Sequence, residues 1–264
     1  MILLSFDIEE FDLPQEYGFK LSIEEQIQIS VQGTLSMLSL LKRHQIKATF
    51  FCTAFFALQA PDIIRKIASE GHEVASHGYH HSSFSPQDLI SSKKVLEDIS
   101  QKHVSGFRMA RMMPVDEKNV FDAGYTYNSS LNPTFIPGRY NNLDKPRTYF
   151  MKEGVFQLPA SVTPIARFPL FWLAYHNLPQ KIFLMLALRT LKKDKYLNIY
   201  FHPWEFVDLK QINGIKLPYI ITKNSGVKML NRLEQFIIYF KLKAYLFSPI
   251  NQFISSIPFS LGNR

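Results

Sequence analysis

Three short segments of the sequence gather side chains that can bind a metal ion or transfer a proton. SFDIEEFD (5–12) supplies four carboxylates, SHGYHH (76–81) holds three of the eight histidines, and YFHPWEF (200–206) adds a histidine and a glutamate. Each segment lies at the end of an apolar run that predicts a buried strand. Because α/β folds carry catalytic groups at the carboxyl ends of parallel strands, we expect the three segments to meet at one site.

The residue types in these segments are those of a hydrolytic metal site. His77 and His81 are four residues apart, which directs two ring nitrogens to one point if the segment makes a helical turn. Asp7, Glu9 and Glu10 lie so close together that their charges repel unless a cation or a proton intervenes. Two imidazoles and one carboxylate form a three-ligand site for a divalent ion, which lowers the pKa of a water molecule. With a second carboxylate as base and a histidine as acid, the set predicts hydrolysis of an amide or an ester.

Each segment taken singly has a common non-catalytic interpretation. An HxxxH spacing often lies on a surface helix, an acidic turn is usually solvated, and the histidine of an HPW segment is most often a loop residue. The occurrence of all three at successive strand ends favours the combined site.

Alternating strand and helix patterns position these segments. We expect strands at 2–6, 46–52, 72–76, 104–108 and 195–201, and helices at 22–44, 60–71, 85–100, 179–191 and 224–245. In the first helix, Ser22 and Glu25 predict a capping box. Its predicted buried face consists of Ile27, Val31, Leu35, Leu38 and Leu41. The alternation favours a single α/β domain over residues 1–264, with a parallel sheet closed or nearly closed into a barrel.

The middle of the chain is less regular. Residues 109–180 are rich in proline and predict only one short helix, at 119–124. A loop region of this length inside a domain is usually functional. Within it, RFPLFWLAYHNLP (167–179) concentrates aromatic side chains that either stack on a sugar, touch a membrane or pack beneath a loop. We favour packing for this segment, and a structural role for its His176.

Composition narrows the class of protein. The net charge is +8, but the basic residues are dispersed and no nucleic-acid-binding module accompanies them, so we expect no nucleic-acid partner. The basic surface favours acidic glycans or anionic lipid headgroups. The single cysteine, Cys52, excludes an internal disulfide. The opening MILLSFD reads as a strand without the features of a leader, so the expected location is cytoplasmic, with at most peripheral membrane contact.

The three segments, together with two further motifs, resemble the polysaccharide deacetylases, the NodB-homology proteins or family 4 carbohydrate esterases. The resemblance covers residues 3–206 in the family's motif order and is closest to a branch whose first motif reads D-x-E. In SFDIEE, Asp7 matches the catalytic base. Glu9 matches the carboxylate ligand, because residues two apart on an extended segment face the same way, and Glu10 is the alternative.

The second and third motifs supply the other proposed ligands and the partner of the base. In SHGYHH, His77 and His81 match the metal-binding histidines and His80 is left as a bystander. In GFRMARMMP, Arg108 matches the arginine that orients the base. The proline that is usual two positions later is Ala110 here.

The fourth and fifth motifs concern the general acid. In IYFHPWEF, His202 matches the acid itself. Many family members support it with an aspartate from the region YNSSLNPTFIPGRYNN, where this chain offers Asn128. An amide does not stabilise an imidazolium as a carboxylate does, so Glu205 or Asp144 is the candidate substitute. Between the two motifs, FQLPASVTP resembles a segment whose backbone lines the groove.

The resemblance implies a distorted (β/α) barrel of the NodB-homology type, complete or incomplete, a divalent metal ion such as zinc, and removal of acetyl groups from an N-acetylated sugar. Asp7 would act as base towards water, the backbone N–H of Tyr140 or a neighbour would help to hold the oxyanion, and His202 would protonate the departing amine. The expected substrate contacts are Tyr79, Arg111, Tyr140 and Trp204.

Two other functions fit the same residues. One is hydrolysis of a small non-sugar amide, which needs the same ligands. The other is a catalytically weak glycan-binding or assembly protein, suggested by Asn128 and Ala110. The sequence leaves open which glycan or glycan precursor is bound, the oligomeric state, and whether the native metal is zinc, cobalt, nickel or iron.

Overall fold

An eight-stranded sheet forms the centre of the structure, a computed structural model that describes residues 1–258. The strand order is β10-β1-β2-β3-β4-β5-β9-β8, and the pairs are parallel apart from the β8–β9 hairpin. The strands are β1 (Ile2–Ile8), β2 (Thr49–Cys52), β3 (Glu73–Ser76), β4 (Gly106–Phe107), β5 (Tyr127–Asn128), β8 (Phe150–Lys152), β9 (Val155–Gln157) and β10 (Leu197–Phe201). A separate antiparallel pair consists of β6 (Phe135–Ile136) and β7 (Tyr140–Asn141).

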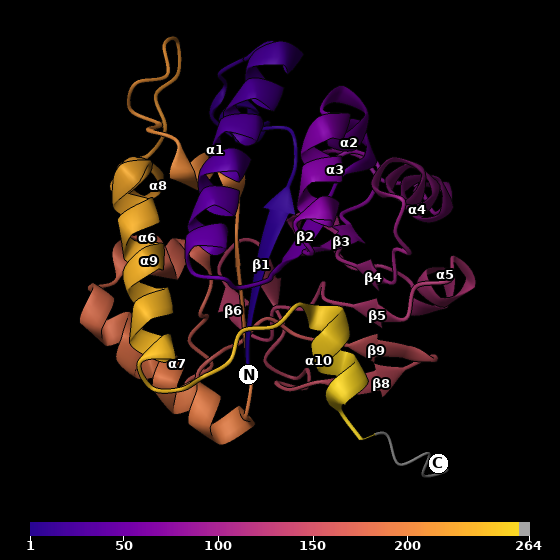
Figure 1. Ribbon diagram of the computed structural model, residues 1–264, viewed down its shortest axis with the longest axis vertical. Helices are drawn as coiled ribbons and strands as arrows, with labels where there is room; N and C mark the ends of the chain where they lie inside the picture. Colours follow the sequence, from indigo (N-terminus) through magenta and orange to yellow (C-terminus); the bar gives the residue numbers. More distant parts are fainter. Residues whose placement is uncertain (259–264) are drawn as a thin grey trace.

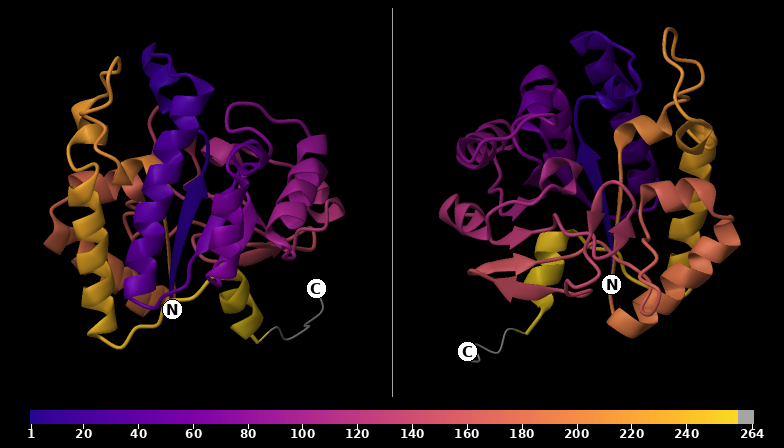
Figure 2. Two further views of the ribbon diagram at one scale, coloured as in Figure 1. Left: turned by 45° about the horizontal axis from the view of Figure 1, so that its top comes forward. Right: turned by 180° about the vertical axis from the view of Figure 1, so that it is seen from behind.

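Helices surround the curled sheet (Figures 1 and 2). The longer ones are α1 (Ile23–Arg43), α3 (Pro61–Ser69), α4 (Gln87–Ser100), α7 (Gln180–Asp194) and α9 (Val227–Lys241). Shorter elements connect them: η1 (Leu13–Tyr17), α2 (Ala54–Gln59), η2 (Ala110–Met112), α5 (Glu117–Asp122), α6 (Trp172–Asn177), η3 (Pro203–Phe206) and α8 (Tyr219–Thr222). The main core lies between sheet and helices, where Leu4, Phe6 and Ile8 of β1 pack with the buried faces of α1 and α9.

The barrel is open and distorted, as the sequence predicted. The sheet ends at β8 on one side and at β10 on the other. The segment that follows β9 bridges towards β10, because the Ser161 N–H donates to the Asn198 carbonyl at 2.9 Å and the Asn198 N–H donates to Ser161 Oγ at 2.9 Å. This segment belongs to FQLPASVTP, which the resemblance had placed along the groove.

One end of the barrel is filled by a short helix that the sequence analysis did not predict, α10 (Ile250–Ser256). Its Ile250 and Phe253 pack with Leu3 and Phe51 on the inner face of the sheet. Figure 1 shows α10 beside the N-terminus, at the amino ends of the strands. The residues that the sequence assigned to chemistry follow the carboxyl ends and therefore lie at the opposite end.

Helix α1 begins as predicted and buries most of the predicted face, with Leu35 as the exception. Ser22 Oγ accepts the Glu25 N–H and the Glu25 carboxylate accepts the Ser22 N–H, which confirms the capping box. Leu35, predicted to be buried, is 41% exposed. The buried face includes Ser30 and Gly33, because α1 packs closely against η3, the element that follows His202. The helix thus presents small residues to the segment that carries the proposed acid.

Gly33→Ala is expected to destabilise the protein. A Cβ at Gly33 would lie 1.9 Å from the carbonyl oxygen of Pro203, a backbone atom that cannot move without η3. Overpacking of this kind costs about 1–3 kcal/mol, which outweighs the better helix propensity of alanine. Denaturant unfolding measures the loss, and Leu35→Ala on the exposed side of α1 is the control, with an expected change within about 0.5 kcal/mol. Equal stability of Gly33→Ala and wild type would contradict the close packing.

The prediction of a single short helix in residues 109–180 is wrong. The structure adds η2, α6 and five short strands, β5 to β9, to the expected helix, which is α5. Strands of two or three residues show no periodicity in a sequence. They form here because neighbouring strands supply their hydrogen bonds, as when β5 joins both β4 and β9.

The helix expected at 224–245 packs on the barrel. Helix α9 buries one apolar stripe in the main core, consisting of Met229, Leu233, Phe236, Ile237 and Phe240. Among residues 1–258, no helix has the length and apolar character that crossing a bilayer requires.

Candidate functional site

Strand β1 delivers the first two candidate residues to the inside of the barrel. Leu4, Phe6 and Ile8 face the helices, so the alternation of the strand turns Asp7 to the opposite, inner face. Glu9 follows just beyond the end of the strand and is buried with Asp7. The carboxylates are therefore held by the strand geometry that the spacing of SFDIEE predicted.

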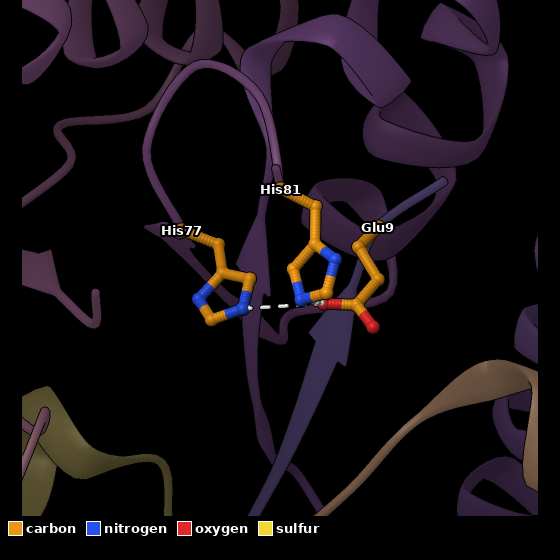
Figure 3. A group of neighbouring side chains, drawn as sticks. All are labelled: Glu9, His77 and His81. Carbon is orange, nitrogen blue, oxygen red and sulfur yellow. Dashed lines mark ion pairs between the residues drawn. The ribbon is translucent and has the colours of Figure 1, made fainter. Parts of the chain in front are cut away.

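Glu9, His77 and His81 form a buried three-residue cluster (Figure 3). Glu9 Oε2 lies 3.3 Å from His77 Nε2 and 3.0 Å from His81 Nε2. Burial would raise the pKa of Glu9, but His81 and His77 hold it well below its usual value. Burial likewise lowers the pKa of His81, but Glu9 and Asp12 outweigh this and raise it to about 10. These pKa shifts of Glu9 and His81 arise because the three candidate ligand atoms lie close together.

The outer hydrogen bonds of the two histidines fix which nitrogen faces the cluster. His77 Nδ1 donates to the Arg108 carbonyl at 2.9 Å, and His81 Nδ1 donates to Asp12 Oδ1 at 2.7 Å. With Nδ1 protonated in each ring, both Nε2 lone pairs can point inwards, as in metal-ligating histidines. Glu9 Oε2 is a buried oxygen with no hydrogen-bond partner among the described residues. This donor set fits a divalent ion of the zinc type, bound by Glu9, His77 and His81.

The alternative ligand Glu10 is engaged elsewhere. Its Oε1 accepts the His81 backbone N–H at 2.9 Å and its Oε2 accepts the Thr53 hydroxyl at 2.9 Å. Glu10 thus anchors the loop that carries His81 and is not part of the three-residue cluster. His80 packs on Phe55 with ring centroids 5.0 Å apart and is also outside the cluster, as expected of a bystander.

Arg108 forms a buried ion pair with Asp7. It is fully buried at 0% exposure, and its Nη1 donates to Asp7 Oδ1 at 2.6 Å. Ser129 fixes the guanidinium by accepting from Nε through its carbonyl at 3.1 Å and from Nη2 through its hydroxyl at 3.0 Å. The guanidinium also lies over the Phe51 ring, 4.0 Å from its centroid. Asp7 therefore has one orientation, with an edge left free for the cavity that it lines.

His202 is supported by Glu205 rather than by Asn128. Glu205 is fully buried, and its Oε1 lies 3.1 Å from His202 Nδ1 and accepts the His202 backbone N–H at 2.6 Å. Its Oε2 lies 3.0 Å from Nε2 of the buried His176. Burial lowers the pKa of His202, but the hydrogen bond to Glu205 and the charges of Glu9, Glu205 and Asp7 outweigh this and raise it. The ring therefore keeps its proton more readily than a free histidine.

The expected role of Asn128 is wrong in this structure. Its amide donates to Glu117 Oε2 at 3.0 Å, and its oxygen accepts the Ser130 N–H at 3.0 Å and the Ser130 hydroxyl. These bonds fix the loop after β5 and point the side chain away from His202. The other candidate, Asp144, is exposed and pairs with Lys145 at 2.8 Å.

The cluster, Asp7 and His202 open into one cavity with a volume of about 300 Å³. Three of the four predicted substrate contacts line it: Arg111, Tyr140 and Trp204. Trp204 also stacks on His202 with centroids 4.9 Å apart and places its Nε1 3.4 Å from Glu9 Oε1. Tyr79 is not among the lining residues; it packs beside His80, because the turn at Gly78 directs it away from the cavity.

Three residues of the site were noticed in the sequence but not assigned the contacts that they make. Asp12 orients His81, and it lies in the acidic segment that was read only for its other carboxylates. Trp172 on α6 lines the cavity and packs edge-on against His202, with centroids 5.4 Å apart. His176, one helical turn later on α6, bonds to Glu205. Trp172 packs against the hydrophobic clusters, as the preferred interpretation of this segment held, and also lines the cavity; the crowding of aromatics near a proline-rich loop was the signal for this second role.

Comparison with known proteins agrees with the arrangement. Residues 21–110 match the family model described as polysaccharide deacetylase, a range that includes His77, His81 and Arg108. The chain is 28% identical over 69 residues to the peptidoglycan-N-acetylmuramic acid deacetylase PdaA of Bacillus subtilis, which covers 26% of each protein. It is 30% identical over 90 residues to the peptidoglycan-N-acetylglucosamine deacetylase PgdA of Listeria monocytogenes, covering 34% of this chain and 19% of that one. The matched stretches are thus about a quarter or less of these relatives.

Solved structures share the fold along the whole chain. A Mycobacterium smegmatis protein assigned to the polysaccharide deacetylases aligns over 100% of this chain and 93% of its own, with a TM-score of 0.67 and 18% identity. PuuE allantoinase aligns over 98% and 91%, with a TM-score of 0.63 and 15% identity. A Bacillus anthracis pseudoenzyme of the CE4 family aligns over 96% and 64%, with a TM-score of 0.54 and 14% identity. At these identities the likeness establishes the α/β fold, and the activity has to be argued from the site.

Proposed function

We propose that this chain is a metal-dependent deacetylase of the polysaccharide deacetylase family, in the branch with a D-x-E first motif, and that it hydrolyses the N-acetyl group of a sugar. One observation carries the proposal: a cluster that can hold a metal opens into the same cavity as a carboxylate clamped by an arginine and a histidine backed by a carboxylate. Hydrolysis converts the acetamide and water into acetate and a free amine. It needs a base at one side of the amide and an acid at the other.

Glu9, His77 and His81 are the proposed ligands of a divalent ion, most simply Zn²⁺. Bound there, the ion would polarise the acetamide carbonyl and lower the pKa of water. The protein's own part begins with Asp7, which accepts the proton of the attacking water while Arg108 keeps its carboxylate in place. Charge that develops on the carbonyl oxygen would find a donor in the backbone N–H of Tyr140 or a neighbour at the cavity wall.

His202 is the proposed general acid, and Glu205 tunes it. The nitrogen that does not face Glu205 is Nε2, which is free to hold a proton for the departing amine. Burial lowers the pKa of His202, but the hydrogen bond to Glu205 and the charges of Glu9, Glu205 and Asp7 outweigh it and raise the pKa, so the ring holds this proton more readily than a free histidine. Trp204 and Trp172 pack on the ring from two directions and restrict its orientation.

Glu205→Gln is expected to move the alkaline limb of the pH–rate profile to lower pH. The charge of Glu205 is one of those that raise the pKa of His202, together with Glu9 and Asp7 of the β1 segment. Its loss lets His202 give up its proton at a lower pH, so activity falls earlier on the alkaline side, by about one pH unit or more. Asp208→Asn, at an exposed acid three residues further on, is the control. An unshifted limb in Glu205→Gln would show that Glu205 does not tune the acid.

The proposed function is tested by acetate release from N-acetylglucosamine oligomers. Metal-stripped protein should be inactive, and addition of one equivalent of Zn²⁺ should restore release, because the base and acid alone do not polarise the amide. Release that is equally fast with and without metal would refute the metal-dependent reaction. Metal binding without release from any N-acetylated sugar would refute the assignment as a sugar deacetylase.

The geometry weakens one of the two rival functions. The case for a catalytically weak binding protein rested partly on Asn128, and Glu205 now supplies the buried carboxylate that Asn128 does not. Hydrolysis of a small non-sugar amide remains compatible with the same groups, and the fold is shared with PuuE allantoinase. A side-by-side assay of N-acetylated sugars and small ureide or amide substrates separates the two reactions.

A further inference from the structure

The catalytic cavity combines the proposed catalytic groups, which we call its floor, with many apolar side chains. Its apolar wall is here defined as Leu13, Tyr17, Met112, Ile136, Leu173 and Ile220, all of which line the same cavity. These residues come from η1, η2, β6, α6 and α8, so apolar groups approach the mouth from several sides. Four of the six carry no group that can hydrogen-bond a sugar hydroxyl, and the Met112 thioether is only a weak acceptor.

The charged groups at the same mouth are already paired with one another. Glu16 accepts hydrogen bonds from Arg111 and, at 3.4 Å, from Arg139. Arg111 also donates to Asp12 Oδ2 at 3.1 Å. Arg111 Nε has no partner among the described residues, but a neutral oligosaccharide placed against the apolar side chains of this wall would give up water for few hydrogen bonds, which costs free energy for each buried hydroxyl left unpaired.

One part of the wall is fixed in place although its side chains remain open to solvent. Asn177 of α6 donates to the carbonyl of Ile220 at 2.9 Å and to that of Leu173 at 2.9 Å, which ties α8 to α6. Ile220 is nevertheless 51% exposed, and the adjacent Tyr219 is 68% exposed. An apolar group entering the cavity would cover this surface, which is favourable in proportion to the area removed from water.

We propose that the substrate is an N-acetylated sugar whose non-reacting end carries an apolar group, an alkyl, aryl or isoprenoid aglycone, which packs against the wall formed by Ile136, Leu173 and Ile220. This inference rests on the proposed deacetylase function and specifies its substrate class. The sugar ring lies over the catalytic floor near Trp172 and Trp204, and the aglycone leaves the cavity past α8. The continuity of the wall with the catalytic floor favours one amphiphilic substrate over separate occupants.

The test compares methyl, butyl, hexyl and octyl glycosides of N-acetylglucosamine, all below their micellar concentrations, with zinc-loaded protein. The specificity constant kcat/KM for acetate release should rise about threefold for each methylene that reaches the wall. Ile220→Ser should remove most of the gain for the octyl glycoside and leave the methyl glycoside nearly unaffected. Ile165→Ser is the matched control, because Ile165 is 83% exposed and does not line the cavity.

Binding of the four glycosides to the Asp7→Asn protein separates this inference from the proposed function. Quenching of tryptophan fluorescence measures this binding. Deacetylation of all four glycosides at equal kcat/KM would overturn the inference and leave the deacetylase standing. Tighter binding of the octyl glycoside that Ile220→Ser abolishes, without acetate release in wild type, would support the wall and overturn the sugar deacetylase. Absence of both binding and release for every glycoside would overturn both.

Discussion

Asp7→Asn is expected to lower the rate of acetate release by at least about a hundredfold while the protein remains folded and binds metal. An amide has the shape of the carboxylate but does not accept a proton from water at neutral pH. Asp7 lies beside the Glu9, His77 and His81 cluster without belonging to it, so the metal ligands remain intact. Zinc content after dialysis, unfolding temperature and initial rate of acetate release are the three measurements.

The Asp7→Asn substitution also affects Arg108, the ion-pair partner of Asp7, and the unfolding temperature measures this effect separately from the rate. Arg108 is fully buried and loses its opposite charge, and removal of one member of a buried ion pair is destabilising by about 3–5 kcal/mol. Asparagine can still accept the Arg108 hydrogen bond through its oxygen, and Ser129 keeps two of its bonds to the guanidinium. A lower unfolding temperature is therefore expected. Asp144→Asn, at an exposed acid, should retain full activity, and a zinc-loaded Asp7→Asn protein with wild-type rate would exclude Asp7 as the base.

The sequence predicted which of the site's side chains lie together because strand geometry determines their directions. A buried strand alternates its side chains, so Asp7 turns inwards while Phe6 and Ile8 face the helices, and neighbouring parallel strands bring SHGYHH to the same edge. Local periodicity of this kind is visible in one sequence. The inward-facing Asp7 and the meeting of the acidic and histidine segments were expected on this ground, whereas the Asp7–Arg108 pair and the distorted barrel were implied by the family resemblance.

The support of the acid was predicted only in part. The sequence named both Asn128 and Glu205 for this role; in the structure Asn128 donates to Glu117, and Glu205, three residues after His202 in a single helical turn, contacts His202. The contact between Glu205 and His176 joins residues 29 positions apart through a short helix that lacks amphipathic periodicity. Such contacts depend on the packing of α6 over the barrel, which no local sequence pattern indicates.

Long-range packing also explains the errors in the predicted secondary structure. Helix α10 is only seven residues long and is stabilised by packing Ile250 and Phe253 inside the barrel rather than by its own pattern. Leu35 follows helical spacing with the buried leucines but is exposed, because α1 turns its small residues towards η3. In each case a long-range contact outweighs the local preference.

Glu9→Gln is expected to abolish stoichiometric metal binding, whereas Glu10→Gln is expected to retain it. Glu9 Oε2 is the carboxylate oxygen that meets both histidine Nε2 atoms, and a neutral amide oxygen is a much weaker ligand for a zinc-type ion than a carboxylate. The affinity of Glu9→Gln for zinc should therefore fall by more than about a hundredfold, and acetate release should fall with it.

Glu10→Gln is the matched control, because it removes an equivalent charge one residue away. Glu10 only accepts hydrogen bonds from the His81 N–H and the Thr53 hydroxyl, and the glutamine oxygen can keep one of them. Its affinity for zinc should change by less than about tenfold. Competition with a chromophoric chelator measures both variants on one scale. If Glu9→Gln retained zinc and Glu10→Gln lost it, Glu10 would be the ligand. The comparison is direct because each variant removes one buried negative charge, and the two carboxylates differ only in the direction in which they point.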